Sequence, residues 1–384
     1  MSAAQAAEAD RLVARGDLAG AAQLLEAALG ADGGEPLAWL KLAGLRRALR
    51  QPHKALAAAD RALALAPLDF MALALRAGLL AQLGDAGAGP AWHRALAHRP
   101  AGDLPPALAA AVAEGEAISA RWAEARAQRL AAALAPARAL ADDPDAQWRI
   151  ARFADTLLGR ARTYHSEPTD FCFPGLVERE FHPRARFPWL AGLEAAFPAI
   201  RAELMALLQS QRASLEPYVR YADHQPMHQW RALNNNPDWS AIHLLNRGER
   251  VAANADQCPA TMAALAAIDQ PRIPGASPNA MFSLLAPRTA IPAHVGVNNA
   301  RLVCHLPLLV PPGGCWFRVG AETRLWREGE AFVFDDTIEH EADNPTDALR
   351  VVLIFDVWHP DLGAADQAAV AAAVASENDA GTLA

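Results

Sequence analysis

The sequence contains few cysteines and lacks long apolar runs. Its 384 residues include four cysteines, none in CxxC spacing: Cys172, Cys258, Cys304 and Cys315. Cysteines so widely separated predict free thiols in a reducing compartment, not a disulfide framework or a zinc site. No uncharged apolar stretch reaches the roughly 18 residues that a membrane-spanning helix needs. The first ten residues also lack the basic and apolar regions of a signal peptide, so we expect a cytoplasmic protein without a membrane span.

Basic residues are outnumbered by acidic ones. The chain has 35 lysines and arginines against 43 aspartates and glutamates, a formal net charge of -8. A surface that binds nucleic acid needs a dense basic stripe, and the sequence has none, so nucleic acid is not an expected partner. The length and the 52% hydrophobic content suffice for two globular domains or one large one.

The first 135 residues have the composition of a helical repeat. They are rich in Ala and Leu and poor in β-branched residues, which favours helices. Small residues recur 34 residues apart, as at Ala21 and Ala55, and a further copy extends from Phe70 to Pro100. This pattern resembles the tetratricopeptide repeat, in which paired helices approach closely through small residues. A generic array of Ala-rich helical hairpins is the alternative.

The sequence after this array predicts a linker, a β domain and a tail. Residues 136–170 are expected to be a helical linker, interrupted at Pro136 and at residues 142–145, with Asp145 as the N-cap of the last helix. From Phe171 onward, Pro, Trp and Phe become frequent and short strand-like runs alternate with turn sequences, which predicts an all-β sandwich or barrel. The expected strands are residues 280–286, 301–310, 315–319, 331–334 and 349–358, and the expected helices are 188–211 and 259–267.

We therefore expect a multidomain α + β chain. Residues 1–135 would form the tetratricopeptide-like helical domain, residues 136–170 the linker, and residues 171–362 the β domain with flanking helices. The Ala-rich tail, residues 363–384, should form one weak helix with a frayed end.

Two histidines and an arginine are candidate functional residues. His294 and His340 lie at strand ends with turn residues nearby, where a β barrel presents ligands, and two neutral imidazoles suit Fe(II). Arg350 begins an apolar strand, and its guanidinium could bind a carboxylate with two parallel hydrogen bonds. Taken singly, each histidine is more often an ordinary surface residue, and Arg350 could instead reach out to solvent.

The region 280–360 resembles the aspartyl/asparaginyl β-hydroxylase family. Ser283 precedes His294 by eleven residues, Asp356 begins the last matching stretch, and weaker similarity reaches back to Phe171 through Trp239. Helical repeats ahead of the catalytic domain also recur in this family. The matching stretches are RLVCHL (301–306), GGC (313–315), ETRLWREG (322–329), FDDTIEHE (334–341) and DVWHP (356–360).

The resemblance implies a double-stranded β-helix, a cupin-like jelly roll that holds iron. It implies a dioxygenase that uses Fe(II), 2-oxoglutarate and O2 to hydroxylate a C–H bond, for example in an Asp or Asn residue of a protein or peptide. The implied iron ligands are His294 and His340. The implied 2-oxoglutarate contacts are Arg350 and Ser283 at the distal carboxylate, His305 near the metal-chelating end and Trp239 in the wall. Alternation along the strand places Arg301 on the same face as His305, where it could bind substrate.

Two positions depart from common patterns. Most enzymes of this chemistry carry a carboxylate two residues after the first histidine, and Gly296 stands there in this chain. The family is known for lacking that acid. Some relatives have a second arginine where this chain has Val303, which leaves the charge of the substrate open.

Other functions are compatible with the same residues. A two-histidine iron site with glycine at the acid position could accept chloride and act as a halogenase. Alternatively, the helical repeats could be a scaffold and the jelly roll a non-catalytic ligand-binding domain. The repeats could dock a protein or peptide substrate, since such arrays present a concave groove, or they could mediate self-association; the sequence gives no oligomeric state.

Overall fold

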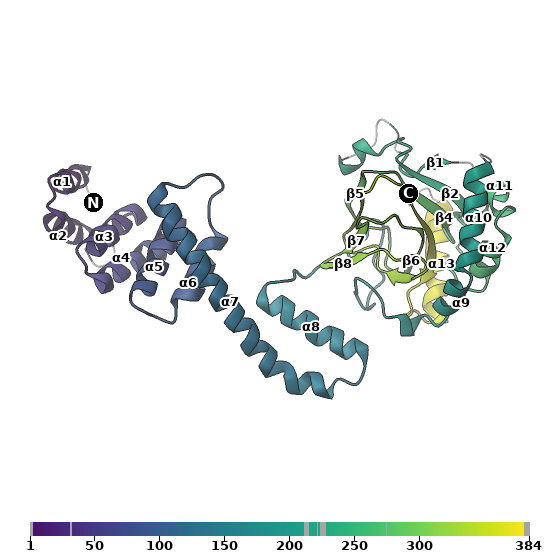
Figure 1. The fold of residues 1–384 in the computed structure, drawn as a ribbon, viewed down its shortest axis with the longest axis horizontal. Coiled ribbons are helices and arrows are strands. Elements are labelled where there is room, and N and C mark those ends of the chain that lie inside the picture. The colour runs from purple at the N-terminus through teal and green to yellow at the C-terminus, as the bar shows by residue number, and fades with distance from the viewer. Residues whose placement is uncertain are drawn as a thin grey trace. The chain divides into compact units, whose positions relative to one another are not determined.

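A computed structural model describes residues 3–30, 33–210, 215–220, 222, 228–273 and 275–379 of the chain. The chain divides into two compact units, Met1–Ala154 and Asp155–Ala384 (Figure 1). The division predicted from the sequence, with boundaries at 135, 170 and 362, stays a prediction.

The first unit is built from successive packed helix pairs. Buried alanines such as Ala21, Ala43 and Ala59 lie at the interfaces and let the helix backbones approach closely. The side chains of Asp17 and Asp69 accept hydrogen bonds of 2.8 Å from Gly20 N and Ala72 N and so cap two of the helices. The helices are α1 (Ala3–Ala14), α2 (Leu18–Leu29), α3 (Pro36–Ala48), α4 (Pro52–Leu65), α5 (Phe70–Gln82), α6 (Ala88–Ala97), α7 (Pro106–Leu140) and α8 (Pro144–Leu158). A helical array is confirmed, whereas its assignment to the tetratricopeptide type stays a prediction.

Two details of the predicted linker are wrong. Pro136 does not interrupt the chain, because α7 continues through it to Leu140. The last turns of α7 are exposed, so the carbonyl group that loses its helical partner at the proline can bind water. The cap of α8 is Asp143 instead of Asp145: its carboxylate accepts a 2.7 Å hydrogen bond from Ala146 N, and Pro144 opens the helix.

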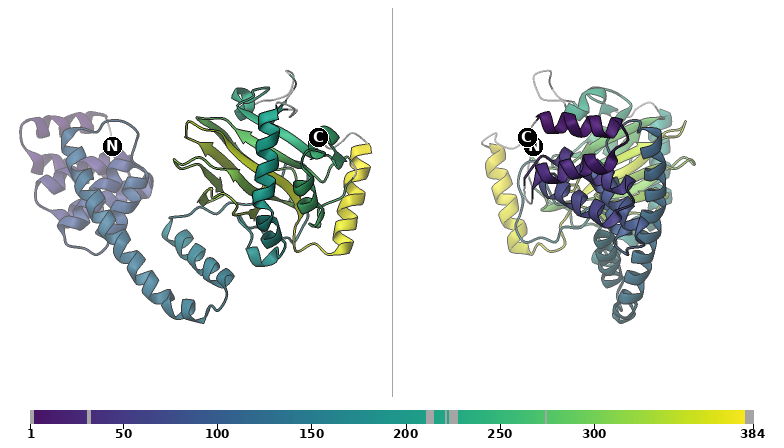
Figure 2. Two further views of the ribbon diagram at one scale, coloured as in Figure 1. Left: turned by 45° about the vertical axis from the view of Figure 1, so that its right-hand side comes forward. Right: turned by 90° about the vertical axis from the view of Figure 1, so that its left-hand side faces the viewer.

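The second unit contains two antiparallel sheets, the arrangement of a jelly roll (Figure 2). The larger sheet has the order β1-β2-β4-β11-β6-β9, with β3 paired to β2, and the smaller sheet has the order β5-β10-β7-β8. The strands are β1 (Glu216–Pro217), β2 (Trp239–Asn246), β3 (Glu249–Arg250), β4 (Ala280–Leu285), β5 (Thr289–His294), β6 (Arg301–Leu309), β7 (Trp316–Val319), β8 (Glu322–Leu325), β9 (Phe332–Phe334), β10 (His340–Asn344) and β11 (Arg350–Trp358).

Helices cover the outer face of the larger sheet. The main ones are α9 (Leu190–Ala195), α10 (Phe197–Ser210) and α12 (Pro259–Ala266), with the short α11 (Ala252–Ala255) nearby. Leu204 of α10 belongs to the same core as Phe282, Leu306 and Leu353, which alternate along the sheet with residues of the opposite face. The other face of the sheet is thereby left free for polar side chains and looks toward the smaller sheet.

The predicted strands and helices agree with the observed ones to within two residues, with two kinds of exception. The helix predicted at 188–211 is divided at Ala196 into α9 and α10. Strands β2, β5, β8 and β10 were not predicted as strands, because their polar residues and prolines hide the alternation, and the two-residue strands β1 and β3 are too short to show one. The tail forms α13 (Ala364–Asp379), whose Val370 and Val374 are buried in a small core with Ile273.

Among the described residues, no helix combines the length and the apolar composition that a membrane span requires.

Candidate functional site

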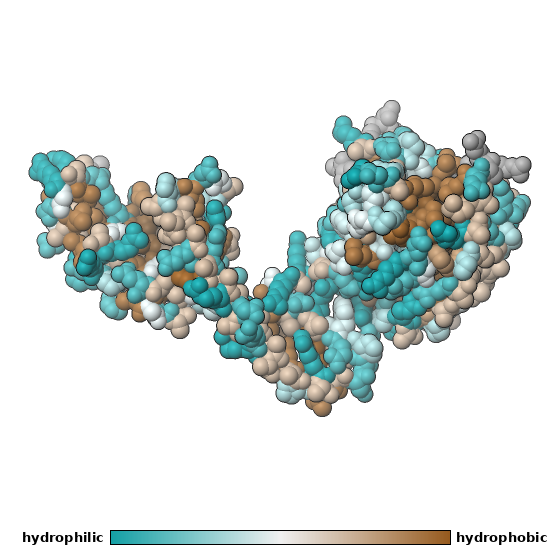
Figure 3. Space-filling model, viewed as in Figure 1, coloured by the Kyte–Doolittle hydropathy of each residue, from teal (hydrophilic) through white to brown (hydrophobic). Residues whose placement is uncertain are grey.

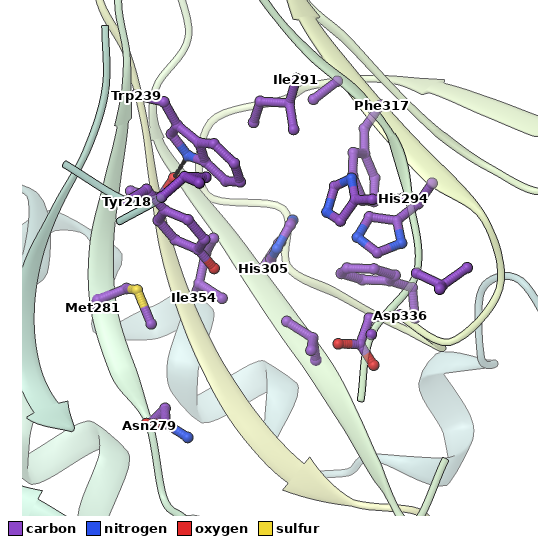
Figure 4. Close-up of a pocket in the computed structure, with 18 of the residues that line it drawn as sticks. Tyr218, Trp239, Asn279, Met281, Ile291, His294, His305, Phe317, Asp336 and Ile354 are labelled. Carbon is purple, nitrogen blue, oxygen red and sulfur yellow. Dashed lines mark hydrogen bonds between the residues drawn. The ribbon is translucent and has the colours of Figure 1, made fainter. Parts of the chain in front are cut away.

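A cavity of about 480 Å3 lies between the two sheets. Figure 4 shows His305 and Ile354 on the inner face of the larger sheet and His294 and Asp336 opposite them. All seven residues singled out from the sequence line this cavity: Trp239, Ser283, His294, Arg301, His305, His340 and Arg350. Their roles in binding and catalysis stay predictions.

The two candidate metal ligands are brought together by strand pairing. His294 ends β5 and His340 begins β10, and the two residues are direct partners in the antiparallel register. Their ring centroids lie 4.0 Å apart. The two histidines are far apart in the sequence, and the pairing of β5 with β10 in the smaller sheet makes them neighbours.

Both imidazoles are neutral and oriented by the backbone. His294 Nδ1 lies 2.8 Å from the Pro292 carbonyl oxygen, and His340 Nδ1 lies 3.1 Å from that of Ile338. A carbonyl oxygen only accepts, so each Nδ1 carries the proton and each Nε2 keeps a free lone pair. Burial lowers the pKa of His294 to about 3 and that of His340 to about 4. At neutral pH the pair therefore has the protonation state that metal binding needs.

The space beside Gly296 is taken by a carboxylate from another segment. A Cβ atom at Gly296 would lie 2.2 Å from Asp336 Oδ2, so a side chain at this position would collide with Asp336. Asp336 Oδ1 is buried without a hydrogen-bond partner, and Oδ2 lies 3.0 Å from Arg301 Nη2. Burial raises the pKa of the Asp336 carboxyl, and Arg301 opposes that rise. Within the described ranges, no group of three or more His, Cys, Asp or Glu residues has the geometry to hold a metal ion.

The opposite part of the cavity is suited to an anion. Arg350 is only 2% exposed, and its Nε has no hydrogen-bond partner. Burial lowers the pKa of this guanidinium to about 10, which leaves it charged at neutral pH. Arg350 forms no ion pair with any of the described residues. Its guanidinium lies 5.2 Å from the centre of the Trp326 ring. A buried cation without a counter-ion predicts an anionic ligand.

Ser283 and Trp239 complete this anion-binding end. Trp239 Nε1 donates a 3.1 Å hydrogen bond to Ser283 Oγ. Because the indole only donates, the Ser283 hydroxyl keeps its own proton for a ligand. Tyr218 stacks on Trp239 with 3.9 Å between ring centroids, which fixes the indole in place.

His305 lies within an aromatic cluster on the inner face of β6. Its ring centroid is 4.7 Å from that of Phe334 and 5.2 Å from that of Phe317. Burial and the nearby Arg350 hold its pKa well below the ordinary value, and its Nδ1 has no partner. A neutral histidine with one unused nitrogen can hydrogen-bond a ligand between Arg350 and the histidine pair.

The strand register orders these groups along the larger sheet. Arg350 begins β11, Ile354 pairs with both Met281 and His305, and Asp356 pairs with Val303. Arg350 and Asp356 share one face and are separated by roughly 20 Å along the strand. The cavity therefore has an anion-binding end at Arg350 and Ser283 and a second end at Asp356 and Arg301.

Several lining residues were missed by sequence reasoning. Tyr218 and Trp230 contribute aromatic walls, and the Trp230 ring centroid lies 4.8 Å from that of His294. Their segment shows no periodic pattern in the sequence that would reveal this role. Asp356 also lines the cavity, and it could have been found, because it falls on the same β11 face as Arg350 by simple alternation.

The residues present fit an iron ion and 2-oxoglutarate. The two free Nε2 atoms suit a divalent first-row metal. The unpaired Arg350 suits the distal carboxylate of a diacid. Three buried polar atoms without partners, Arg350 Nε, His305 Nδ1 and Asp336 Oδ1, belong to residues that line this cavity.

Comparison with known proteins agrees with the predicted resemblance. Residues 194–360 match the family model described as Aspartyl/Asparaginyl beta-hydroxylase. The ornithine lipid ester-linked acyl 2-hydroxylase of Rhizobium tropici is 36% identical over 178 residues, which cover 46% of this chain and 59% of that protein. The human aspartyl/asparaginyl beta-hydroxylase is 34% identical over 132 residues, which cover 34% of this chain and 17% of that protein. The family resemblance is therefore confirmed for the β domain.

The matched segments cover about half of the length of several of these relatives. Aspartate beta-hydroxylase domain-containing protein 2 of Xenopus tropicalis is 30% identical over 210 residues, which cover 53% of this chain and 54% of that protein. Among solved structures, a predicted oxalate decarboxylase of Thermotoga maritima is 13% identical with a TM-score of 0.21, over 31% of this chain and 80% of that one. A likeness this low carries no argument about function.

Proposed function

We propose that this chain, whose residues 194–360 match the aspartyl/asparaginyl β-hydroxylase family model, is an Fe(II)- and 2-oxoglutarate-dependent dioxygenase that hydroxylates a C–H bond. The observation that carries the proposal is the pairing, within one cavity, of two adjacent neutral histidines with a buried arginine that lacks a counter-ion. Neither feature stabilises the fold by itself, because burying an uncompensated cation is costly. A metal ion that accepts the two Nε2 lone pairs and a ligand that brings negative charge to Arg350 would together explain both.

In this proposal each residue has a distinct task. His294 and His340 hold the metal through Nε2, while their Nδ1–H groups stay bonded to the Pro292 and Ile338 carbonyls. Arg350 and Ser283 bind the distal carboxylate of 2-oxoglutarate, and His305 lies near its metal-chelating end. When bound, iron and 2-oxoglutarate supply the O2 activation that the protein side chains cannot.

The same geometry argues against the halogenase alternative. A halide would have to lie near the side-chain position of residue 296, and the carboxylate of Asp336 already occupies that space. An anion there would be repelled, so hydroxylation is the better-supported outcome. The non-catalytic alternative is weakened because both histidines and the arginine are present in one cavity.

The relatives' names give two kinds of substrate. One relative is named for the acyl chain of a lipid, and others are named for aspartyl and asparaginyl residues. We infer that the helical unit could present a protein or peptide to the second unit, which stays a proposal here.

The metal assignment is tested by removing one imidazole at a time. His294→Ala and His340→Ala should each lower Mn(II) affinity by at least about tenfold and abolish succinate formation from 2-oxoglutarate with Fe(II). His53→Ala removes an exposed histidine of α4 and is the matched control, which should behave as the unmodified protein. Undiminished turnover in both site variants would refute the proposal.

A second variant separates cosubstrate binding from metal binding. Arg350→Gln should leave Mn(II) affinity nearly unchanged but raise the 2-oxoglutarate concentration needed for half-maximal turnover by about 100-fold, because a charge-assisted bidentate contact is lost. An unchanged requirement would mean that Arg350 does not contact 2-oxoglutarate.

A further inference from the structure

Trp326, which directly follows β8, carries a buried polar atom that the proposed function leaves unused. The residue is 6% exposed and lines the cavity. Its Nε1 has no hydrogen-bond partner among the described residues. An indole N–H can only donate, and a buried donor without an acceptor lowers the stability of the fold. An acceptor that enters the cavity would remove this cost.

A second tryptophan shows that such an atom alone does not indicate a ligand. Trp92, in the first unit, is 3% exposed, and its Nε1 also has no partner among the described residues. Trp92 belongs to an apolar core with Leu73 and Val112. The surroundings of Trp326 therefore have to decide whether its free donor serves a ligand.

Two neighbours of Trp326 have polar atoms in the same condition. The Arg350 guanidinium lies 5.2 Å from the centre of the Trp326 ring. The His305 ring stacks on the indole, with 5.5 Å between the centroids and 23° between the planes. Arg350 Nε and His305 Nδ1 are also buried without partners among the described residues. An anion that accepted hydrogen bonds from this cluster would satisfy several buried donors at once.

The donors that surround this position come from both sheets. Arg350 begins β11 and Ser283 lies in β4, so both belong to the larger sheet, whereas Trp326 follows β8 of the smaller sheet. The backbone N of Trp326 donates to the Cys315 carbonyl at 3.2 Å, which fixes the start of the side chain. A carboxylate has two oxygens with about four acceptor sites, so it can bind Arg350, Ser283 and Trp326 together.

The remaining neighbours of the indole are aromatic. The ring centroids of Phe317 and Phe332 lie 5.2 and 5.4 Å from that of Trp326. Figure 3 shows hydrophobic side chains gathered where the surface of the second unit is hollowed. Hydrogen bonds to a charged group are stronger in such apolar surroundings than in water. The loss of one donor from this cluster should therefore be measurable.

We propose that Trp326 is a cosubstrate-binding residue, whose indole N–H donates a hydrogen bond to the distal carboxylate of 2-oxoglutarate beside Arg350 and Ser283. The inference rests on the proposed function and adds a residue to its cosubstrate site. Trp326 thereby favours a diacid over a 2-oxo acid that ends in a methyl group, because only the diacid offers an acceptor to the indole.

The proposal is tested with two 2-oxo acids of equal chain length. 2-Oxoglutarate and 2-oxopentanoate, which has a methyl group in place of the distal carboxylate, are titrated by calorimetry into the Mn(II)-loaded protein. Trp326→Phe should weaken the binding of 2-oxoglutarate by about tenfold, because one hydrogen bond to a charged group is lost. The same substitution should leave the binding of 2-oxopentanoate nearly unchanged.

A matched substitution in the first unit controls for the loss of an indole. Trp92→Phe also removes a buried, unpartnered N–H and should leave 2-oxoglutarate binding as in the unmodified protein. Circular dichroism confirms that each variant is folded. An equal loss of affinity for both acids in Trp326→Phe would mean that the indole only shapes the cavity, and this result would overturn the proposal.

The indole N–H signal of the unmodified protein gives a direct readout, which decides if 2-oxopentanoate binds too weakly for calorimetry. The chain has ten tryptophans, and the Trp326 resonance is assigned by its loss in Trp326→Phe. If that variant is not folded, nuclear Overhauser contacts with the Phe317 and Phe332 rings assign it. In the Zn(II)-loaded protein, which is diamagnetic, 2-oxoglutarate should move this resonance downfield, as a new hydrogen bond does, and 2-oxopentanoate should not.

The outcomes separate this inference from the proposed function. Failure of the Mn(II)-loaded protein to bind 2-oxoglutarate would refute the function itself. Normal 2-oxoglutarate binding with an unmoved Trp326 resonance, or with unchanged affinity in Trp326→Phe, would overturn the role of Trp326 alone.

Discussion

At the scale of single residues, the second unit contains buried histidines that the proposed chemistry does not use. His182 is 8% exposed, its Nε2 has no hydrogen-bond partner, and its ring lies 5.1 Å from that of His359 in an edge-on arrangement. Burial lowers the pKa of His182 to about 3, with His359 contributing in the same direction. In the unfolded chain the same group titrates near its ordinary pKa of 6.5.

This difference predicts a loss of stability in mild acid. Between pH 6.5 and about 3 the unfolded chain binds a proton at His182 that the folded chain does not, so the free energy of unfolding falls as the pH falls. One such histidine contributes at most about 1.4 kcal/mol per pH unit. His182→Gln should therefore reduce the difference in unfolding free energy between pH 7 and pH 5, measured by urea denaturation of the unmodified protein and the variant. His98→Gln alters an exposed histidine and should leave that difference as it is; an equal effect of both substitutions would contradict the prediction.

At the scale of elements, a segment before the β domain supports both metal-ligand positions. Ser166 forms a bridge with Ile338, and Glu167 N donates to the Thr337 carbonyl at 2.9 Å. A few residues later, Thr169 N donates to the Gly296 carbonyl at 3.1 Å. Residues 166–171 therefore run beside the segments that carry His294 and His340, and they fix the backbone that holds the imidazoles.

A hydroxyl contact in this segment can be tested. Ser166 Oγ lies 2.6 Å from Thr337 Oγ1, and Thr337 Oγ1 donates to Asp335 Oδ1 at 2.5 Å. Ser166→Ala should lower the free energy of unfolding by about 1 kcal/mol and weaken Mn(II) binding several-fold. Thr163→Ala removes an exposed hydroxyl three residues away and should change neither quantity. A stability loss without any change in metal affinity would show that the segment supports the fold but not the ligand positions.

At the scale of the whole molecule, the two compact units have separate cores. Leu25, Leu42 and Ala59 belong to a core in the first unit, whereas the cavity and its ligands lie in the second. A ligand that binds only the folded form of a unit stabilises that unit by an amount that grows with the logarithm of the free ligand concentration relative to Kd. Thermal unfolding of the full chain should show two transitions, of which Mn(II) with 2-oxoglutarate raises only one, by roughly 2–4 °C per kcal/mol of binding energy. An equal shift of both transitions in scanning calorimetry would contradict this independence.

The sequence alone was enough to identify the helical array and five of the eleven strands found in the described part of the β domain. Ala21 and Ala55 predicted close helix packing, and alternation along 301–310 and 349–358 predicted strands that the structure contains. These are local signals, because periodicity and side-chain size depend on neighbours in the chain. Pro136 and Asp145 were misjudged for the same reason: whether a proline is tolerated or an aspartate caps a helix depends on solvent exposure and on the exact turn geometry.

The candidate site divides in the same way. His294, His340 and Arg350 were found from their sequence contexts. Only the pairing of β5 with β10 in the folded protein places the two imidazoles next to each other. The sequence suggested that Arg301 could bind substrate; only the fold brings Asp336 and Asp356 to it. Charge compensation depends on distance in space, and residues far apart in the chain have no fixed distance until the sheets close around the cavity.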